Sequence, residues 1–197
     1  MRWMPRDGWS LLDRHLARLE QSARHFGFIY AASQIRDELD GAVRSADGPL
    51  RVRLLLAEDG AVRVERSPLA GREGVWRVRL AKHPVDPSDE FLYHKTTNRT
   101  VYERARLPDC DDVILWNPAG EVTETTIANL VVEDSHIGGR RITPPIVCGL
   151  LPGTLRAELL ATGEISEGRV TVEQLKTAPR FWLVNSVRGS CAGILIE

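Results

Sequence analysis

The spacing of hydrophobic residues changes once within the first 65 residues, and this change limits the folds open to the chain. Five apolar residues recur at intervals of three and four: Leu12, Leu16, Leu19, Ala23 and Phe26. This spacing predicts an amphipathic helix over 10–26, and a similar pattern predicts a second helix over 33–45. From residue 50 the apolar positions alternate with other residues on both sides of a turn at 58–60, which is typical of a β-hairpin. The fold class is therefore α+β or mixed α/β.

A proline-containing segment over 83–88 is the best candidate for a linker. Pro84 and Pro87 interrupt any regular element there. We therefore expect a small α/β subdomain over 1–86 and a larger subdomain over 87–197. Residues 76–80 lie before this boundary and are predicted to form a third strand of the hairpin's sheet. After it we expect helices over 97–107, 153–161 and 172–177, and strands over 113–116, 129–133 and 181–187.

Charge and composition argue against several classes of protein. The chain of 197 residues has 26 basic and 27 acidic residues, whereas a dedicated nucleic-acid binder is normally basic. No apolar run approaches the roughly 20 residues that cross a bilayer, and the N-terminus lacks the apolar core of a signal peptide, so we expect a cytoplasmic protein without a membrane or nucleic-acid partner. The three cysteines and five histidines have no metal-ligand spacing, and no metal site is expected. The histidines are His15, His25, His83, His94 and His136.

Lysine is scarce, which shortens the list of residues that could supply a titratable amine. Lys82, Lys95 and Lys176 are the three lysines among 26 basic residues, and the other 23 are arginines, whose side chains stay charged near neutral pH. Lys95 follows a short apolar run and precedes hydroxyl and amide residues within 91–99. Considered alone, it is most simply a solvated loop residue.

Two further segments could carry chemistry. Glu124 lies among small and hydroxyl residues in 121–129, where alone it would be an exposed carboxylate at a strand end. In 143–156 the pair Pro152-Gly153 opens a predicted helix, whose first backbone N–H groups suit a phosphate, although such junctions are common. Together with Lys95, these segments supply an amine, an acid and an anion site, which are the parts needed to hold pyridoxal phosphate.

The order and wording of these segments resemble the class IV (fold-type IV) aminotransferase family, over nearly the whole chain from Leu11 to Val187. This family includes branched-chain and D-amino-acid aminotransferases and a lyase branch that acts on 4-amino-4-deoxychorismate. The resemblance implies an α+β fold with two subdomains and pyridoxal 5'-phosphate as cofactor. It places the family's Schiff-base lysine at Lys95, followed by an Asn-Arg pair at 98–99. It places the glutamate that meets the pyridine nitrogen at Glu124, within the match V-T-E…A-N-L over 122–130.

The resemblance also implies a set of anion-binding residues. The phosphate turn G-L-L-P-G-x-x-R matches 149–156 and implies backbone donors at Thr154 and Leu155. The family's phosphate arginine matches Arg18, within a helix segment over 15–19. The segment N-S-V-R-G over 185–189 resembles the family's last cofactor and substrate loop. It implies Ser186 near the phosphate and Arg188 facing a substrate carboxylate.

Within the family, the wording is closest to the lyase domains found fused to or encoded beside aminodeoxychorismate synthase. The implied reaction releases pyruvate and 4-aminobenzoate, a folate precursor. Branched-chain aminotransferases have a tyrosine five residues after the lysine, where this chain has Thr100. The alternatives are an aminotransferase for D- or branched-chain amino acids, or a non-catalytic remnant, because the family usually has further N-terminal strands and their absence implies a truncated or detached domain. A homodimer, and a synthase as partner or fusion, are also implied by resemblance.

Overall fold

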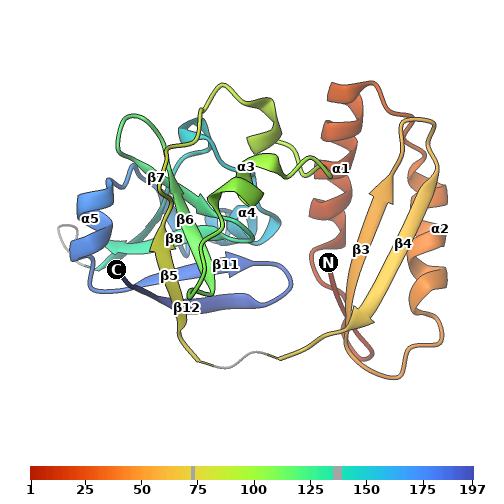
Figure 1. Cartoon of the computed structure of the whole chain (residues 1–197). Helices are drawn as coiled ribbons and strands as arrows, with labels where there is room; N and C mark the ends of the chain where they lie inside the picture. Colours follow the sequence, from red (N-terminus) through yellow and green to blue (C-terminus); the bar gives the residue numbers. More distant parts are fainter. Residues whose placement is uncertain (72–73, 135–138) are drawn as a thin grey trace. The chain divides into compact units, whose positions relative to one another are not determined.

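The computed structural model describes residues 1–71, 74–134 and 139–197, and it divides the chain into two compact units, Met1–Arg72 and Glu73–Glu197 (Figure 1). His136 lies outside the described residues. Helices and strands occur in both units, as the α+β class requires. Each unit has its own sheet and its own hydrophobic core.

The first unit is a four-stranded sheet with two helices. Its elements are β1 (Arg2–Met4), β2 (Gly8–Trp9), α1 (Leu12–Phe26), α2 (Ala32–Val43), β3 (Leu50–Leu56) and β4 (Val62–Pro68). The strand order is β2-β1-β3-β4, and all neighbouring strands are antiparallel. The predicted helices and the predicted hairpin are confirmed. The short strands β1 and β2, which have no clear alternation, were not predicted.

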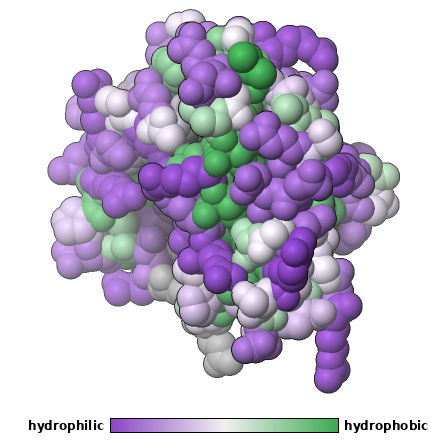
Figure 2. All heavy atoms as spheres, turned by 90° about the vertical axis from the view of Figure 1, so that its right-hand side faces the viewer, coloured by the Kyte–Doolittle hydropathy of each residue, from purple (hydrophilic) through white to green (hydrophobic). Residues whose placement is uncertain are grey.

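Both helices pack on one face of this sheet. The buried core of the unit consists of Leu16, Ile35, Leu39, Val43 and Val52. The neighbouring strand positions point to the opposite face, where Arg53 and Arg63 pair with Glu65. Figure 2 shows one face of the molecule coloured by hydropathy, and hydrophilic side chains cover most of that view. Ile29 is a large apolar side chain of this unit that remains exposed, at 61%.

The second unit is built around an eight-stranded sheet. Its strands are β5 (Trp76–Leu80), β6 (Asp112–Trp116), β7 (Val122–Thr125), β8 (Asn129–Asp134), β9 (Arg140–Thr143), β10 (Ser166–Glu167), β11 (Phe181–Asn185) and β12 (Gly189–Leu195). Its helical elements are η1 (Glu90–Leu92), α3 (Thr100–Ala105), η3 (Ile146–Cys148), α4 (Thr154–Ala161) and α5 (Val172–Thr177). The strand order is β10-β9-β8-β11-β12-β5-β6-β7, and β7 also pairs with β8. This last pairing closes six of the strands into a barrel.

The prediction that residues 76–80 extend the hairpin's sheet was wrong. These residues form β5, which pairs in parallel with β12 and β6 in the second unit, with Trp76 opposite Gly193 and Val78 opposite Asp112. The physical reason is burial: Trp76 and Val78 are almost fully buried in the core of the second unit. The two compact units therefore divide between Arg72 and Glu73, ahead of the expected boundary at 86/87.

Three clusters of buried residues hold the helices of the second unit against its strands. Alternate residues of β8 and β11 point to opposite sides, so Leu130 and Leu183 enter the main core while Val131 and Val184 face α4. Helix α3 and η1 pack against β6 through a separate cluster that contains Leu92, Tyr102, Val113 and Leu115. In the described part of the chain, no helix is long and apolar enough to cross a membrane.

Candidate active site

The hairpin between β7 and β8 places two polar side chains directly opposite each other. Glu124 on β7 pairs with Asn129 on β8, and this is the one register pair between the two strands. The turn between them is closed by Thr125, whose backbone N–H and hydroxyl both donate to the carbonyl oxygen of Ala128 (2.8 and 3.0 Å). Residues opposite each other in an antiparallel pair share one face. The spacing E-x-x-x-x-N therefore brings a carboxylate and an amide together.

The carboxylate of Glu124 is buried, with 3% of the residue exposed, and it accepts three hydrogen bonds from three different elements. The hydroxyl of Tyr102 on α3 and the backbone N–H of Leu151 donate to its Oε1 (2.8 and 3.0 Å). The Nδ2 of Asn129 donates to its Oε2 (3.1 Å). Since buried polar groups are costly without partners, these bonds explain how the carboxylate is tolerated here.

Burial raises the pKa of Glu124 to about 7, because the charged form loses its hydration. The hydrogen bonds from Leu151 and Tyr102, and the positive charges of Lys95 and Arg99, each lower this pKa in turn. The pKa of this carboxyl group therefore lies near neutral pH, and a further positive charge placed against the group would favour its ionised form.

Lys95 lies in the loop between η1 and α3, where it is exposed and close enough to lower the pKa of Glu124 electrostatically. The other two lysines lie elsewhere on the surface. Lys82 is exposed just after β5, and Lys176 on α5 pairs with Glu173 (2.7 Å). Of the three lysines, Lys95 is therefore the one that the structure brings to the buried carboxylate.

The predicted phosphate turn leads from η3 into α4. The carbonyl oxygen of Leu151 accepts a hydrogen bond from Nδ2 of Asn129 (2.9 Å), so one amide group holds both this turn and Glu124. A Cβ atom on Gly153 would overlap Oδ1 of the same Asn129, which explains why glycine occupies this position. Thr154 and Leu155 are the first two residues of α4, and the N–H groups at this position have no acceptor within the helix. Such a helix end can bind an anion.

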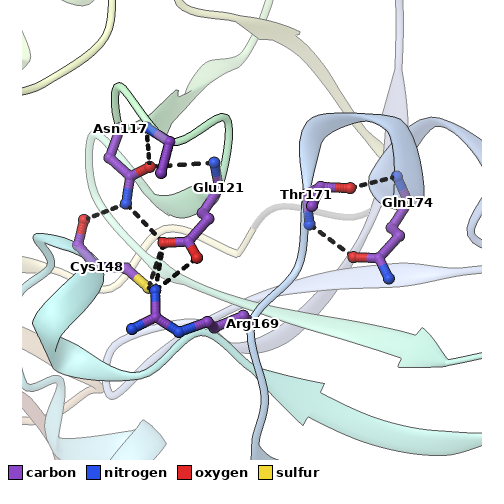
Figure 3. A network of polar contacts seen from close by, with 7 residues as sticks. Asn117, Glu121, Cys148, Arg169, Thr171 and Gln174 are labelled. Atoms are coloured by element: carbon purple, nitrogen blue, oxygen red, sulfur yellow. Dashed lines mark hydrogen bonds and ion pairs between the residues drawn. The ribbon is translucent and has the colours of Figure 1, made fainter.

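A second polar network fixes the start of the same turn (Figure 3). The Nδ2 of Asn117 donates to the carbonyl oxygen of Cys148 (3.2 Å) and to Oε2 of Glu121 (3.0 Å). The thiol of Cys148 donates to the same carboxylate (3.3 Å), which also pairs with Arg169 (2.7 Å). The turn over 149–153 is thus anchored at Cys148 by this network and at Leu151 by Asn129.

The loop between β11 and β12 carries the predicted residues Ser186 and Arg188. Asn185 accepts hydrogen bonds from the backbone N–H groups of Val187 and Arg188 (3.0 and 2.9 Å), and its own amide reaches the carbonyl oxygen of Ile127 (3.5 Å). The loop therefore lies beside the turn of the β7–β8 hairpin. Ser186 is half-buried, while Arg188 is exposed with its guanidinium 5.4 Å from the centre of the Trp76 ring.

Arg18, the expected phosphate arginine, lies half-buried on α1 of the first unit. The described contacts within the second unit connect Lys95, Glu124 and the phosphate turn, and place the Ser186 loop beside their hairpin. The role of Arg18 therefore stays a prediction from the resemblance.

Two residues of the site had no role in the sequence analysis. Asn129 was part of a motif match only, although its spacing from Glu124 across a turn predicts a cross-strand pair. Tyr102 lies seven residues after Lys95 and carries no motif signal. Helix α3 brings its hydroxyl to Glu124, a contact over 22 residues that needs the tertiary fold.

The family model for Amino-transferase class IV matches residues 1–192. The chain belongs to this family. A candidate aminodeoxychorismate lyase of Schizosaccharomyces pombe (strain 972 / ATCC 24843) is 35% identical over 198 residues, covering 94% of this chain and 84% of that protein.

Solved structures share the fold. The crystal structure of a candidate amino-acid aminotransferase from Mesorhizobium loti is 37% identical, with a TM-score of 0.94, and the match covers 100% of this chain and 97% of that one. A hypothetical aminotransferase from Mycobacterium tuberculosis in its PLP-bound form is 24% identical, with a TM-score of 0.79 over 99% of this chain and 79% of that one. The expected fold-type IV architecture is confirmed.

This class IV chain is an enzyme whose cofactor is pyridoxal phosphate, as the resemblance implied. The residues present fit that group. Lys95 supplies a primary amine whose charge acts on the buried carboxylate of Glu124, and the turn before α4 ends in backbone N–H groups suited to a phosphate.

Proposed function

We propose that this class IV enzyme is a 4-amino-4-deoxychorismate lyase that releases pyruvate and 4-aminobenzoate. The observation that supports the proposal best is the buried Glu124, which is held by three hydrogen bonds and faces the charge of Lys95. The similarity to the S. pombe candidate lyase also supports this substrate.

Each predicted residue has one task in this proposal. When bound, pyridoxal phosphate supplies an electron sink for charge that develops on a substrate carbon. Lys95 supplies the amine that holds the cofactor covalently, and Glu124 places a negative charge at the ring nitrogen. The N–H groups of Thr154 and Leu155 bind the phosphate, together with Arg18 and Ser186. Arg188 binds a carboxylate of the substrate through its planar guanidinium.

The reaction is an elimination, and it needs one base. The Nζ of Lys95 would be the base that accepts the proton from C4 of the substrate. The C–O bond of the neighbouring enolpyruvyl ether breaks, and the electron pair of the C4–H bond completes the aromatic ring of 4-aminobenzoate. The enolpyruvate takes up a proton and becomes pyruvate. No oxidant or reductant is consumed.

An aminotransferase for D- or branched-chain amino acids is the second candidate, and the 37% identity to the M. loti candidate amino-acid aminotransferase favours it. Thr100 counts against a branched-chain pocket. Its hydroxyl and N–H both point to Oδ1 of Asn98 (2.9 and 3.3 Å), so this position supports the start of α3 and offers no phenol. An inactive remnant is the third candidate.

Reductive trapping tests the proposed lysine. Purified protein is mixed with pyridoxal phosphate, reduced with sodium borohydride and mapped by peptide mass spectrometry. We expect the label on Lys95, because Lys176 pairs with Glu173 and Lys82 is solvated away from Glu124. A Lys95→Ala variant should lose the label and a Lys176→Ala variant should keep it. A label confined to Lys82 or Lys176 would refute the assignment.

Product assays separate the three candidates. Pyruvate release from 4-amino-4-deoxychorismate without a 2-oxo acid supports the lyase, whereas amino-group transfer to 2-oxoglutarate supports the aminotransferase. Absence of saturable cofactor binding would indicate the remnant. The proposal also includes a homodimer, a synthase as partner or fusion, and a cytoplasmic location. Light scattering of the purified chain measures its oligomeric state and so tests the homodimer.

A further inference from the structure

We propose that Tyr102 is a positioning residue that holds the Glu124 carboxylate in place and favours its ionised form. The inference rests on the proposed function, because it gives Glu124 its purpose opposite the cofactor's ring nitrogen. Tyr102 acts through Glu124 and is assigned no contact with substrate.

The position of the Tyr102 hydroxyl is fixed from several sides. The residue is 7% exposed, and its ring packs in the cluster with Leu92 and Leu115. The guanidinium of Arg99 lies 4.5 Å from the centre of the ring and donates to the carbonyl oxygen of Thr126. A tyrosine held in this way has few alternative rotamers, so its hydroxyl is directed at Oε1 of Glu124 (2.8 Å).

The Tyr102 hydroxyl donates to Glu124 from a different part of the fold than Asn129 and the Leu151 N–H. A carboxylate has about four acceptor positions; the Tyr102 hydroxyl and the Leu151 N–H occupy two on Oε1, and Asn129 occupies one on Oε2. Asn129 lies in the β7–β8 hairpin and the Leu151 N–H lies in the phosphate turn, and these two segments are joined by the hydrogen bond from Asn129 to the Leu151 carbonyl oxygen. Tyr102 comes from helix α3 and is therefore the donor that ties the carboxylate to the segment carrying Lys95.

The direction of the electrostatic effect follows from the same contacts. Burial and the charge of Glu124 both raise the pKa of Tyr102, so the phenol stays protonated and remains a donor. Its hydrogen bond lowers the pKa of Glu124 against the effect of burial. The groups that influence the carboxyl from the surrounding elements are Lys95, Arg99, Tyr102, Asn129 and the Leu151 N–H. Of these, the Tyr102 hydroxyl and the Leu151 N–H donate to the same carboxylate oxygen, Oε1.

Tyr102→Phe tests the inference, because it removes one oxygen atom and keeps the ring in its cluster. Tyr93→Phe is a matched control. The Tyr93 hydroxyl also donates a short hydrogen bond, but to the carbonyl oxygen of Pro87 (2.6 Å) instead of Glu124, and its ring borders the same cluster. Thermal melting of both variants verifies that they fold.

The first measurement follows the Glu124 carboxyl carbon by ¹³C NMR in cofactor-free protein, with the signal assigned by its loss in Glu124→Gln. We expect Tyr102→Phe to raise the titration midpoint by about one pH unit or more, and Tyr93→Phe to leave it unchanged. The second measurement is a titration with pyridoxal phosphate followed by absorbance. We expect binding about tenfold weaker in Tyr102→Phe only.

The two measurements separate the inference from the proposed function. Equal carboxyl midpoints in the wild type and Tyr102→Phe would overturn the inference, even if the cofactor binds well. A wild-type chain that binds no cofactor would overturn the proposed function, while the carboxyl titration would still show whether Tyr102 controls Glu124.

Discussion

The buried carboxyl group of Glu124 predicts an unusual pH dependence of stability in the cofactor-free protein. Its pKa is raised in the folded state from 4.5 to about 7. A carboxyl group with a raised folded-state pKa binds more protons in the folded state than in the unfolded state between these two values. Its contribution to stability is therefore complete below pH 4.5 and is lost as the pH rises through 7.

The magnitude follows from the size of the shift. A change of 2.5 units, from 4.5 to about 7, corresponds to about 3 kcal/mol at 1.36 kcal/mol per unit. Glu124 is 3% exposed, so solvent screening reduces this value little. With a urea m-value of about 2 kcal/mol/M, the shift amounts to about 1.5 M in the unfolding midpoint.

Glu124→Gln isolates this effect from all other titrating groups. Urea unfolding of both proteins is measured from pH 4.5 to 8, with hydrogen exchange of β8 and β11 amides reporting on the second unit. We expect the wild type to lose about 3 kcal/mol relative to the variant as the pH rises. Glutamine places an NH₂ group against Asn129, but this adds a cost that does not depend on pH and leaves the slope intact.

Glu121→Gln is the control with the opposite sign. Hydrogen bonds from Asn117 and Arg169 lower the pKa of Glu121, so its contribution is present above its ordinary pKa and is lost as the pH falls. The wild type should therefore lose stability relative to Glu121→Gln only on acidification below pH 4.5, and this pair is measured there as well. Parallel stability curves for the wild type and Glu124→Gln from pH 4.5 to 8 would refute the reasoning about the buried carboxyl.

Two further predictions concern the phosphate turn. Gly153→Ala should destabilise the second unit by about 1–3 kcal/mol and weaken binding of pyridoxal phosphate, because the new Cβ displaces Asn129. As a control, Gly41→Ala should stabilise the first unit slightly, because Gly41 lies in helix α2 with open space around it. Urea unfolding measures both effects. Cys148 should resist alkylation at pH 8 while Cys191 reacts. Burial raises the pKa of Cys148 to about 11, so about one thousandth of this thiol is thiolate at pH 8. Peptide mass spectrometry follows alkylation of the two cysteines, and equal rates would contradict the prediction.

Elements with strong local periodicity could be predicted from the sequence. The α1 and α2 helices and the β3–β4 hairpin each bury one face, and that burial determines the spacing of their apolar residues. Strand β12 has glycine and alanine at several positions, so its alternating burial is not visible as an alternation of hydrophobic residues in the sequence, and the strand was not predicted. The partners of β5 could not be predicted, because they come from residues more than 30 positions away in the sequence.

The residues of the candidate site also fall into those that could be predicted from the sequence and those that could not. Lys95, Glu124 and the turn before α4 were singled out by their residue types, and the combination of the three segments and their resemblance to the class IV family gave them their predicted roles. The contributions of Tyr102 and the Leu151 N–H could not be predicted, since they depend on how α3 and the turn pack around β7. A backbone donor in particular leaves no trace in the side-chain sequence.

The position of Glu124 couples folding to function. The barrel closes where β7 meets β8, and the pair at that junction is Glu124 and Asn129. Because the backbone pairing there is short, side-chain bonds from Asn129 and Thr125 supply much of the connection between the strands. A substitution at Glu124 therefore changes barrel closure together with the cofactor chemistry that we propose for this residue, and loss of activity alone could not separate the two. A substitution at Tyr102 removes a bond to the same carboxylate from outside the junction, so it reports on the chemistry with the closure intact.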